Sequence, residues 1–521
     1  MSNLQVASVG KPDISSSENA NVEVESFSKG EMMSGGLLTE DDHEFLNSCD
    51  DAFRKRTLRK LDIRLIPMLG LLYLISYLDR TNIGNANIEG LTEDLGLTSD
   101  QYNIALSIFF IPYVLLEVPS NTILLKFKRP STYIGIIVIA WGTVITLIGI
   151  VQGFGGLVAA RVALGIAEAG FFPAAVFIIS RWYLPNETQS RLALFYTASA
   201  LAGAFSGLLA FAIAKMDGVA GLEGWRWIFI LEGIASVVLG ISCFFLLVDS
   251  PALSTRWLTT DEIRFLELRH LVHHSAQVSD LDTSKKQKWA ILKSILLDWK
   301  IYTLALVYWS NIVPNLGLKF TMPQIIKNMG FTSSNAQLMT IPPYMCGALS
   351  AYVSARLADR YTWRMPFIVG PQFLVVISFA ILFPLSPKIK DNVRVCYFAV
   401  ILSCPGLYPI SPGTSAWTVN NLAGPTKRAQ GVAYMLTIGN AGGIISSFIY
   451  KADEAPRYAT GFGTSLAFAA AGILACFALE YGYHQINRKR AMLDEDAVRA
   501  EYSRDELTLM GDKSPLFRYT L

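Results

Sequence analysis

The chain alternates long apolar stretches with short polar segments. Residues 157–179 are almost unbroken apolar and small side chains, enough to cross a bilayer core of about 30 Å at about 1.5 Å per helical residue. Eleven other stretches have a similar length and character. The pattern predicts an all-α polytopic membrane protein with twelve transmembrane helices, at residues 65–87, 103–125, 132–152, 157–179, 192–214, 226–248, 301–320, 335–356, 365–385, 394–416, 429–450 and 461–483.

The composition agrees with a chain that lies in lipid. Of the 521 residues, 52% are hydrophobic and 17% charged, and the mean hydropathy is +0.37, which is too apolar for a soluble protein of this size. The net charge of +2 gives no reason to expect a nucleic-acid partner. The six cysteines are scattered without metal-ligand spacing and indicate no disulfide framework. The expected partner is therefore the lipid bilayer.

Basic residues orient the predicted helices. Residues 1–60 begin as a polar, acidic stretch that we expect to be a disordered tail, and a basic run from Arg54 to Arg64 precedes the first span. The loops at 88–102 and 153–156 contain no lysine or arginine. Because cytoplasmic loops are enriched in these residues, both termini are predicted to be cytoplasmic. We expect the protein in the plasma membrane.

The two halves of the chain repeat each other. Gly170-Phe-Phe-Pro173 matches Gly406-Leu-Tyr-Pro409, and Leu61-Asp62 matches Leu297-Asp298, in both cases 236 residues later; Arg191 matches Arg428 at almost the same offset. The repeat predicts two six-helix halves with a central site between them. The expected divisions are the tail 1–60, the first half 61–249, a linker 250–298, the second half 299–484 and a C-terminal tail 485–521.

The linker contains one further helix signal. A plausible cap at Thr260 and amphipathic spacing through residue 269 predict a surface helix. His270, His273 and His274 follow it, but no cysteine or acidic cluster accompanies them, so we expect no metal site.

A carboxylate stands at the middle of the fourth span. Glu168 follows Arg161 by two helical turns, so both lie on one helix face. A charge at this depth is costly unless it is paired, protonated or faces water. Two interpretations remain open: a fixed Arg161–Glu168 ion pair, or a carboxyl group at Glu168 that takes up and releases a proton beside a substrate path.

The first span ends in a charged and polar stretch. Asp79 and Arg80 lie at the depth of the outer bilayer, followed by Asn82 and Asn85. Asp79 and Arg80 could simply end the helix at the interface, but the asparagines favour the wall of a cavity. A guanidinium there would suit a carboxylate substrate, because its forked donors match the two oxygens.

Other polar side chains inside spans have two equally good explanations. They either hydrogen-bond neighbouring helices or contact substrate. They are Asn311 and Asn315 in the seventh span, Tyr408 in the tenth, Asn440 in the eleventh, and Glu117 in the second.

The loop Ala355-Arg-Leu-Ala-Asp359-Arg360 resembles the loop motif of the major facilitator superfamily. In that superfamily it latches helices in one conformational state, a role that would fall here on Asp359 and Arg360. The matching loop of the first half, Leu125 to Pro130, lacks the Asp-Arg pair.

A closer resemblance covers roughly residues 58–485. Segments 78–85, 117–121, 161–173, 224–233, 342–344 and 417–428 resemble the fungal allantoate permease family of anion:cation symporters, and are most similar to its nicotinic acid permease branch. The resemblance implies import of a small organic anion with protons, without another cofactor, by a carrier of a fold that is usually monomeric. It implies substrate contact at Arg80, proton coupling at Asp79 and Glu168, and a supporting role for Arg161.

Two other functions fit parts of the sequence. A transporter of the same fold could export a small acidic metabolite, since the sequence does not encode direction. A nutrient sensor that hardly transports would be expected to have longer tails. An enzyme or an ATP-driven pump is not expected, because no nucleotide-binding motif is present.

Overall fold

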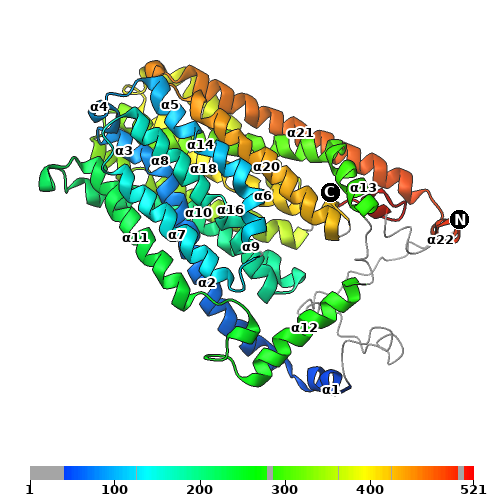
Figure 1. Cartoon of the computed structure of the whole chain (residues 1–521). Coiled ribbons are helices and arrows are strands. Elements are labelled where there is room, and N and C mark those ends of the chain that lie inside the picture. The colour runs from blue at the N-terminus through cyan, green and yellow to red at the C-terminus, as the bar shows by residue number, and fades with distance from the viewer. Residues whose placement is uncertain (1–39, 125, 279–284, 362, 424, 503–509) are drawn as a thin grey trace, which may run out of the picture.

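The computed structural model describes residues 40–124, 126–278, 285–361, 363–423, 425–502 and 510–521, and these residues form helices and connecting turns without a strand. The long helices run side by side between two ends of the molecule (Figure 1). We call the end that carries α1 and residues 510–521 the terminal face, and the opposite end, at α3 to α5, the distal face.

The first half of the chain supplies six crossings. They are α2 (Asp51–Thr81) with α3 (Ile83–Ile88), α5 (Ser99–Ser107) with α6 (Phe110–Leu124), α7 (Pro130–Ile148), α8 (Phe154–Glu168) with α9 (Phe171–Trp182), α10 (Pro185–Ala214) and α11 (Gly224–Leu246). The short α4 (Leu91–Asp94) lies on the distal face.

The second half supplies the other six. They are α14 (Trp299–Asn328), α15 (Ser333–Leu338) with α16 (Ile341–Tyr361), α17 (Pro366–Leu385), α18 (Val393–Leu407) with α19 (Ile410–Asn421), α20 (Pro425–Ile449) and α21 (Ala459–Ala491). The twelve-helix fold predicted from the hydrophobic pattern is therefore confirmed.

By length and apolar composition, eight helical segments of the described chain could each cross a membrane. The remaining crossings are α5–α6, α10, α14 and α15–α16. α5–α6 and α15–α16 are each broken into shorter helices, and α14 carries polar side chains such as Asn311 and Lys319. Polar groups are tolerated at membrane depth where they face protein or a cavity, so these helices are the ones expected to build the site.

Several crossings are interrupted at equivalent places in the two halves. α8 gives way to α9 at Gly170, three residues before Pro173, and α18 gives way to α19 at Tyr408 and Pro409. Proline cannot donate the helical hydrogen bond and so favours a break. The repeat seen in the sequence thus marks the two points where the helices bend beside the centre of the bundle.

Small residues let α7 and α11 pack closely. Added Cβ atoms on Gly142 of α7 or on Gly233 and Gly240 of α11 would meet backbone atoms of the facing helix. In a membrane, where lipid is as apolar as leucine, such close backbone approach is a main source of helix association. This pair forms a rigid outer wall of the first half.

The two halves meet tightly at the distal face. A Cβ on Gly84 of α3 would overlap the carbonyl oxygen of Phe320 in α14. The carbonyl of Ile88 accepts hydrogen bonds from Lys327 Nζ at 2.9 Å and Ser333 Oγ at 3.1 Å. We call this α3–α14 contact the distal gate, and it is closed in this structure.

At the terminal face, each half contains one ion pair, and the two pairs occupy equivalent positions in the repeat. Arg191 Nη2 lies 3.1 Å from Asp62 Oδ2 in the first half, and Lys427 Nζ lies 3.4 Å from Asp298 Oδ2 in the second. The repeat read from the sequence matched Arg191 of the first half with Arg428 of the second. The structure corrects this match by one residue, because Arg428 instead donates from Nε to the carbonyl of Leu422.

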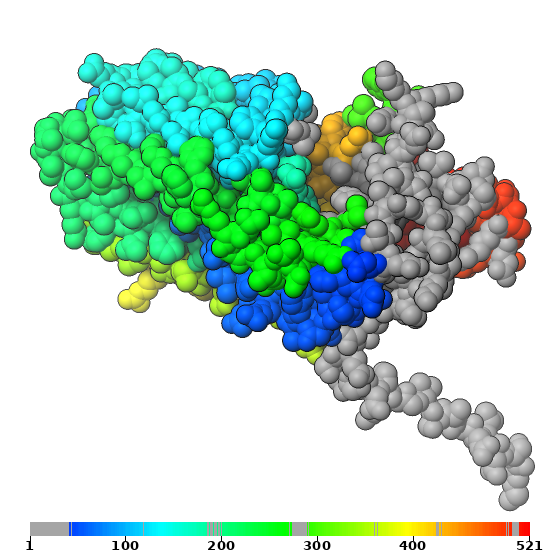
Figure 2. Space-filling view, turned by 60° about the horizontal axis from the view of Figure 1, so that its bottom comes forward, coloured from blue at the N-terminus to red at the C-terminus, as the bar shows by residue number. Residues whose placement is uncertain are grey.

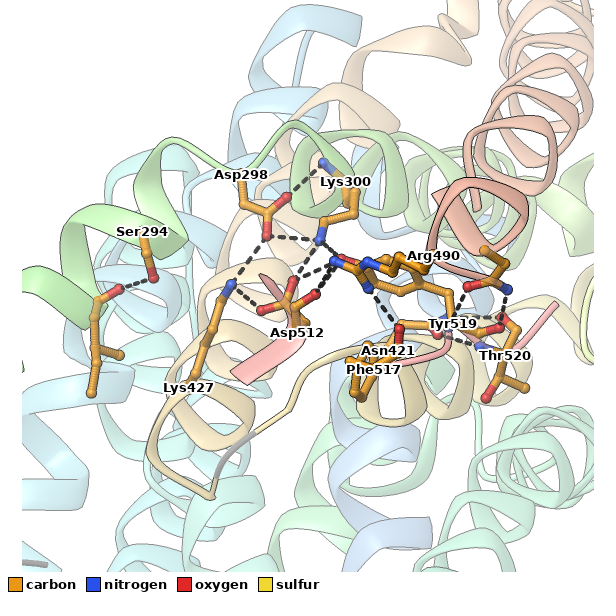
Figure 3. A network of polar contacts seen from close by, with 12 residues as sticks. Ser294, Asp298, Lys300, Asn421, Lys427, Arg490, Asp512, Phe517, Tyr519 and Thr520 are labelled. Atoms are coloured by element: carbon orange, nitrogen blue, oxygen red, sulfur yellow. Dashed lines mark hydrogen bonds and ion pairs between the residues drawn. The ribbon is translucent and has the colours of Figure 1, made fainter. Parts of the chain in front are cut away.

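Residues 510–521 fold back onto the second half, in the region predicted to be a tail (Figure 3). Asp512 is fully buried, and its carboxylate lies 2.5 Å from both Lys300 Nζ and Lys427 Nζ. The Thr520 carbonyl accepts hydrogen bonds from Trp417 and Asn421. Two buried ammonium groups thus meet two carboxylates, those of Asp298 and Asp512, which balances the charge.

The other predicted tail and the linker also contain helices. Residues 40–60 form α1 (Glu40–Ser48) and the start of α2, which Asp50 caps by accepting from the Phe53 amide at 2.7 Å. The linker helix α12 (Thr260–Val278) lies against this segment (Figure 2), where Arg264 Nη2 is 2.6 Å from Asp41 Oδ2. The residue that caps α12 is Thr259 rather than Thr260, because its hydroxyl accepts from the Glu262 amide. The second linker helix is α13 (Lys285–Leu296).

We expect Asp512→Asn to lower the thermal stability of the detergent-solubilised protein. The substitution leaves two buried ammonium groups with one carboxylate, and breaking a buried pair costs about 3–5 kcal/mol. Asp391→Asn, at an exposed position, is the matched control. A melting temperature equal to that of the control would contradict this account of the network.

The same carboxylate predicts an acid limit of stability. Burial raises the pKa of Asp512, but Lys300 and Lys427 outweigh it and hold the pKa below its usual range. The contribution of Asp512 is therefore complete above the ordinary aspartate pKa of about 4 and is lost as the pH falls through the lowered value. The difference in melting temperature between wild type and Asp512→Asn should shrink over that acidic range only.

Candidate functional site

A cavity of about 730 Å³ lies between the two halves. Its walls come from α2, α6, α8, α9 and α10 on one side and α14, α16, α19 and α20 on the other. Asp62, Arg191 and Arg356 also line it, in the parts of their helices that lie nearer the terminal face. The cavity therefore opens toward the terminal face, while the distal gate closes the other end.

At its inner end the cavity holds an ion pair between Arg80 and Glu168. Arg80 Nη2 lies 2.5 Å from Glu168 Oε1, and Ser76 Oγ donates to the same oxygen at 2.5 Å. Both side chains are largely buried, and the guanidinium lies over the rings of Phe109 and Tyr113, 5.0 and 4.7 Å from their centroids. Glu168 is the last residue of α8, at the break before α9.

The fixed Arg161–Glu168 pair considered from the sequence is not formed. Two helical turns separate these residues by about 10.5 Å along the axis. Glu168 instead forms its ion pair with Arg80 from α2. Arg161 is fully buried, donates from Nε to the Ala105 carbonyl at 3.0 Å and lies over Phe109. Its two terminal nitrogens have no hydrogen-bond partner among the described residues.

Four of the polar residues selected from the sequence line the cavity from the second half. They are Asn311, Asn315, Tyr408 and Asn440. Asn311 donates from Nδ2 to the Leu407 carbonyl. Its side-chain oxygen and the Tyr408 hydroxyl have no hydrogen-bond partner among the described residues. Both atoms are buried, in residues that line the cavity.

Other selected residues lie behind the cavity wall. Asp79 is buried between α2, α7 and α11, where it accepts from Trp141 Nε1 at 3.1 Å and from Ser236 Oγ at 2.6 Å. Asn82, expected in the cavity wall, instead donates to Glu232 of α11. It sits at the break between α2 and α3, where the helical phase used to predict its direction no longer applies.

The remaining predicted residues are peripheral. Glu117 of α6 does not line the cavity, and its carboxylate faces the Asn440 amide of the other half. Arg360 is exposed at the end of α16. The side chains of Asp359, His270, His273 and His274 lie outside the described part of the structure, so the proposed latch stays a prediction.

The structure adds a residue that the sequence reasoning missed. Lys319 of α14 is 6% exposed and lines the cavity opposite Arg80 and Glu168. Its ammonium group lies over the rings of Tyr77 and Tyr408, 4.6 and 5.3 Å from their centroids. Among the described residues it has no carboxylate within ion-pair distance. The signal was present, since a lysine directly follows an apolar stretch, but the predicted span ended one residue later.

The inner end of the cavity therefore holds two cations beside aromatic rings: Arg80, which is paired with a carboxylate, and Lys319, which has no such partner among the described residues. Six described cysteines are free, and no group of three or more described histidine, cysteine or acidic side chains could hold a metal ion.

Sequence comparison agrees with this architecture. The profile of the Major Facilitator Superfamily matches residues 69–447. The MFS-type transporter cnsO of Penicillium expansum is 37% identical over 483 residues, 91% of this chain and 92% of its own length. The high-affinity nicotinic acid transporter of Saccharomyces cerevisiae is 32% identical over 485 residues, 93% of this chain and 88% of its own.

Solved structures show the same fold. A D-xylose-proton symporter superposes with a TM-score of 0.58 at 14% identity, covering 80% of this chain and 97% of the symporter. A bacterial homologue of the lysosomal transporter Spinster, in an inward-facing and occupied conformation, gives a TM-score of 0.58 at 16% identity, covering 80% of this chain and 95% of its own. The chain belongs to the Major Facilitator Superfamily, and it is a multi-pass membrane transporter rather than an enzyme.

The Arg80–Glu168 pair yields a stability prediction. Arg80→Met leaves Glu168 buried with Ser76 as its remaining donor and should destabilise the protein by about 3–5 kcal/mol. The double variant Arg80→Met/Glu168→Met removes both charges and should recover most of that loss. Equilibrium unfolding in detergent measures both. Additive losses in the double variant would show that the two side chains do not interact.

Proposed function

We propose that this transporter imports a small organic monocarboxylate together with protons, as members of the allantoate permease family do. The observation that carries the proposal is Lys319, a buried ammonium group that faces the cavity without a carboxylate partner in the described structure. An unpaired buried cation is costly, and a substrate carboxylate beside it would reduce that cost.

The surroundings of Lys319 favour a flat anion. Tyr77 and Tyr408 flank the ammonium group, and the free oxygens of Asn311 and Tyr408 can bond polar atoms of a ring. Aromatic rings stack on such surfaces, and a carboxylate matches the cations. The identity of 32% with a high-affinity nicotinic acid transporter supports an aromatic carboxylate as the first candidate.

Glu168 supplies the coupling to protons. While Glu168 is ionised, it forms an ion pair with Arg80, so the guanidinium group is not available to the substrate. Protonation of Glu168 releases Arg80, and the substrate carboxylate then takes the place of the lost charge. One proton and one carboxylate enter together, and the buried site keeps its net charge. Asp79 lies on the same helix, one residue from Arg80, and is the second coupling acid.

Alternating access follows from the closed distal gate and the open terminal face. The positive-inside rule places the terminal face in the cytoplasm. In that orientation, with the protein in the plasma membrane, this structure is the state that releases imported substrate. Opening requires the Gly84–Phe320 contact to separate while the halves close around Asp62 and Arg191.

The test is uptake of labelled nicotinate, pantothenate, biotin and allantoate into transport-deficient cells, at acidic and neutral external pH, with and without a protonophore. We expect one of these to accumulate at acidic pH and the protonophore to abolish it. Absence of uptake with the protein at the cell surface, combined with efflux of an acidic metabolite from loaded cells, would instead establish export.

For a transported anion, Lys319→Met should raise the half-saturating concentration about 10- to 100-fold. The reason is that a charge-assisted hydrogen bond is worth about 1.5–3 kcal/mol. Lys319→Arg keeps the charge and serves as the control, which should retain most of the affinity. Equal affinities in Lys319→Met and wild type would remove Lys319 from the substrate site.

Glu168→Gln should separate transport from the proton gradient. The neutral side chain no longer competes for Arg80, so exchange of external for internal substrate should persist while accumulation at acidic pH is lost. Proton-driven accumulation that equals wild type would rule out Glu168 as the coupling acid.

A further inference from the structure

A second buried acid lies in the first half, in a sequence motif that the proposed function leaves unused. Glu232 belongs to the stretch from Gly224 to Gly233 and is 7% exposed in α11. Its Oε2 accepts a hydrogen bond from the Asn82 amide, and its Oε1 has no hydrogen-bond partner among the described residues.

Asp79 is the charged neighbour of this group. It is 1% exposed, its charge interacts with that of Glu232, and its Oδ1 also lacks a partner in the described structure. The packed helices α3, α7 and α10 contribute neutral groups here: Asn85, Trp141 and Ser206. No cation of the described structure lies within ion-pair distance of either carboxylate; Arg80 pairs with Glu168, and Arg161 donates from Nε to the Ala105 carbonyl.

Two carboxylates without a cation cannot both be ionised at this depth. Burial disfavours each charge, and the like charge of the other adds to the cost. Asp79 accepts two hydrogen bonds, which stabilise its ionised form, whereas Glu232 accepts one. When only one of the two groups is protonated, the proton therefore lies on Glu232.

A chain of contacts connects Glu232 through Asn82 to the distal gate. Asn82 stands at the break between α2 and α3, and its side-chain oxygen accepts from Asn85 Nδ2 and Ser206 Oγ. This network fixes the direction of α3, which carries Gly84 against Phe320. Ionised Glu232 would repel Asp79 and disturb the network that holds α3 against α14.

We propose that Glu232 is a proton-binding site that controls the distal gate: the gate closes when Glu232 is protonated and opens when it is ionised. Glu232 takes the proton from water on the distal side while the gate is open, and the loss of this proton reopens the gate. This rests on the proposed proton-coupled function but concerns a site outside the substrate cavity.

The first experiment is infrared spectroscopy of the purified full chain across a pH series. We expect the wild type at neutral pH to show the stretching band of a protonated, buried carboxyl group, and Glu232→Gln to lose it. Glu223→Gln, an exposed position just before the same helix, is the matched control and should keep the band. A band that is unchanged in Glu232→Gln would overturn the proposal.

The second experiment measures the gate by the distance between spin labels at Asp100 and Lys451, exposed positions beside the Ser99–Asp453 contact of the two halves. The exposed Cys346 is first replaced by serine. We expect the wild-type distance to lengthen as the pH rises, and Glu232→Gln to stay short at every pH. A Glu232→Gln profile that follows wild type and Glu223→Gln would contradict control by Glu232.

Neither readout needs a substrate. If no carboxylate is transported but both readouts depend on Glu232, the proposed substrate is wrong and the gate assignment stands. If proton-driven uptake is found but neither readout depends on Glu232, the gate assignment alone fails.

Discussion

The arrangement of the centre depends on the ion pair between Arg80 and Glu168. Each charge alone would be costly inside a membrane, and together they are nearly neutral. The pair also ties α2 to the broken end of α8, so it fixes the wall of the cavity as well as its charge. A ligand that takes one member must provide for the other, which makes binding and protonation parts of one equilibrium.

The sequence predicts the fold well because bilayer thickness imposes a length and composition on every crossing. The repeat was equally readable, since Asp62 and Asp298 occupy equivalent places in the two halves and each pairs with a basic side chain. Within the site, Arg80 and Glu168 were found because charges stand out in apolar stretches. The sequence could not show that Glu168 pairs with Arg80 and not with Arg161, because the partner depends on which helix packs beside α8 in the tertiary structure.

Three other features were not predicted correctly from the sequence, each for a physical reason. Asn82 was given the wrong direction because it lies at a helix break, where a regular turn no longer relates neighbouring side chains. Lys319 lay next to a predicted helix end and resembled an interfacial lysine, but α14 continues to Asn328. Asp512 sits in a polar stretch whose burial requires two lysines that are distant in sequence.

The two ion pairs of the terminal face differ in their contact with water. Asp62 and Arg191 line the open cavity, with side chains 36% and 20% exposed, whereas Asp512 covers Asp298 and Lys427, which are 6% and 9% exposed. Dissolved ions screen charges that water reaches and hardly affect buried ones. Ionic strength should therefore loosen one side of the entrance and leave its counterpart intact, so two halves with one architecture have unequal sensitivity to salt.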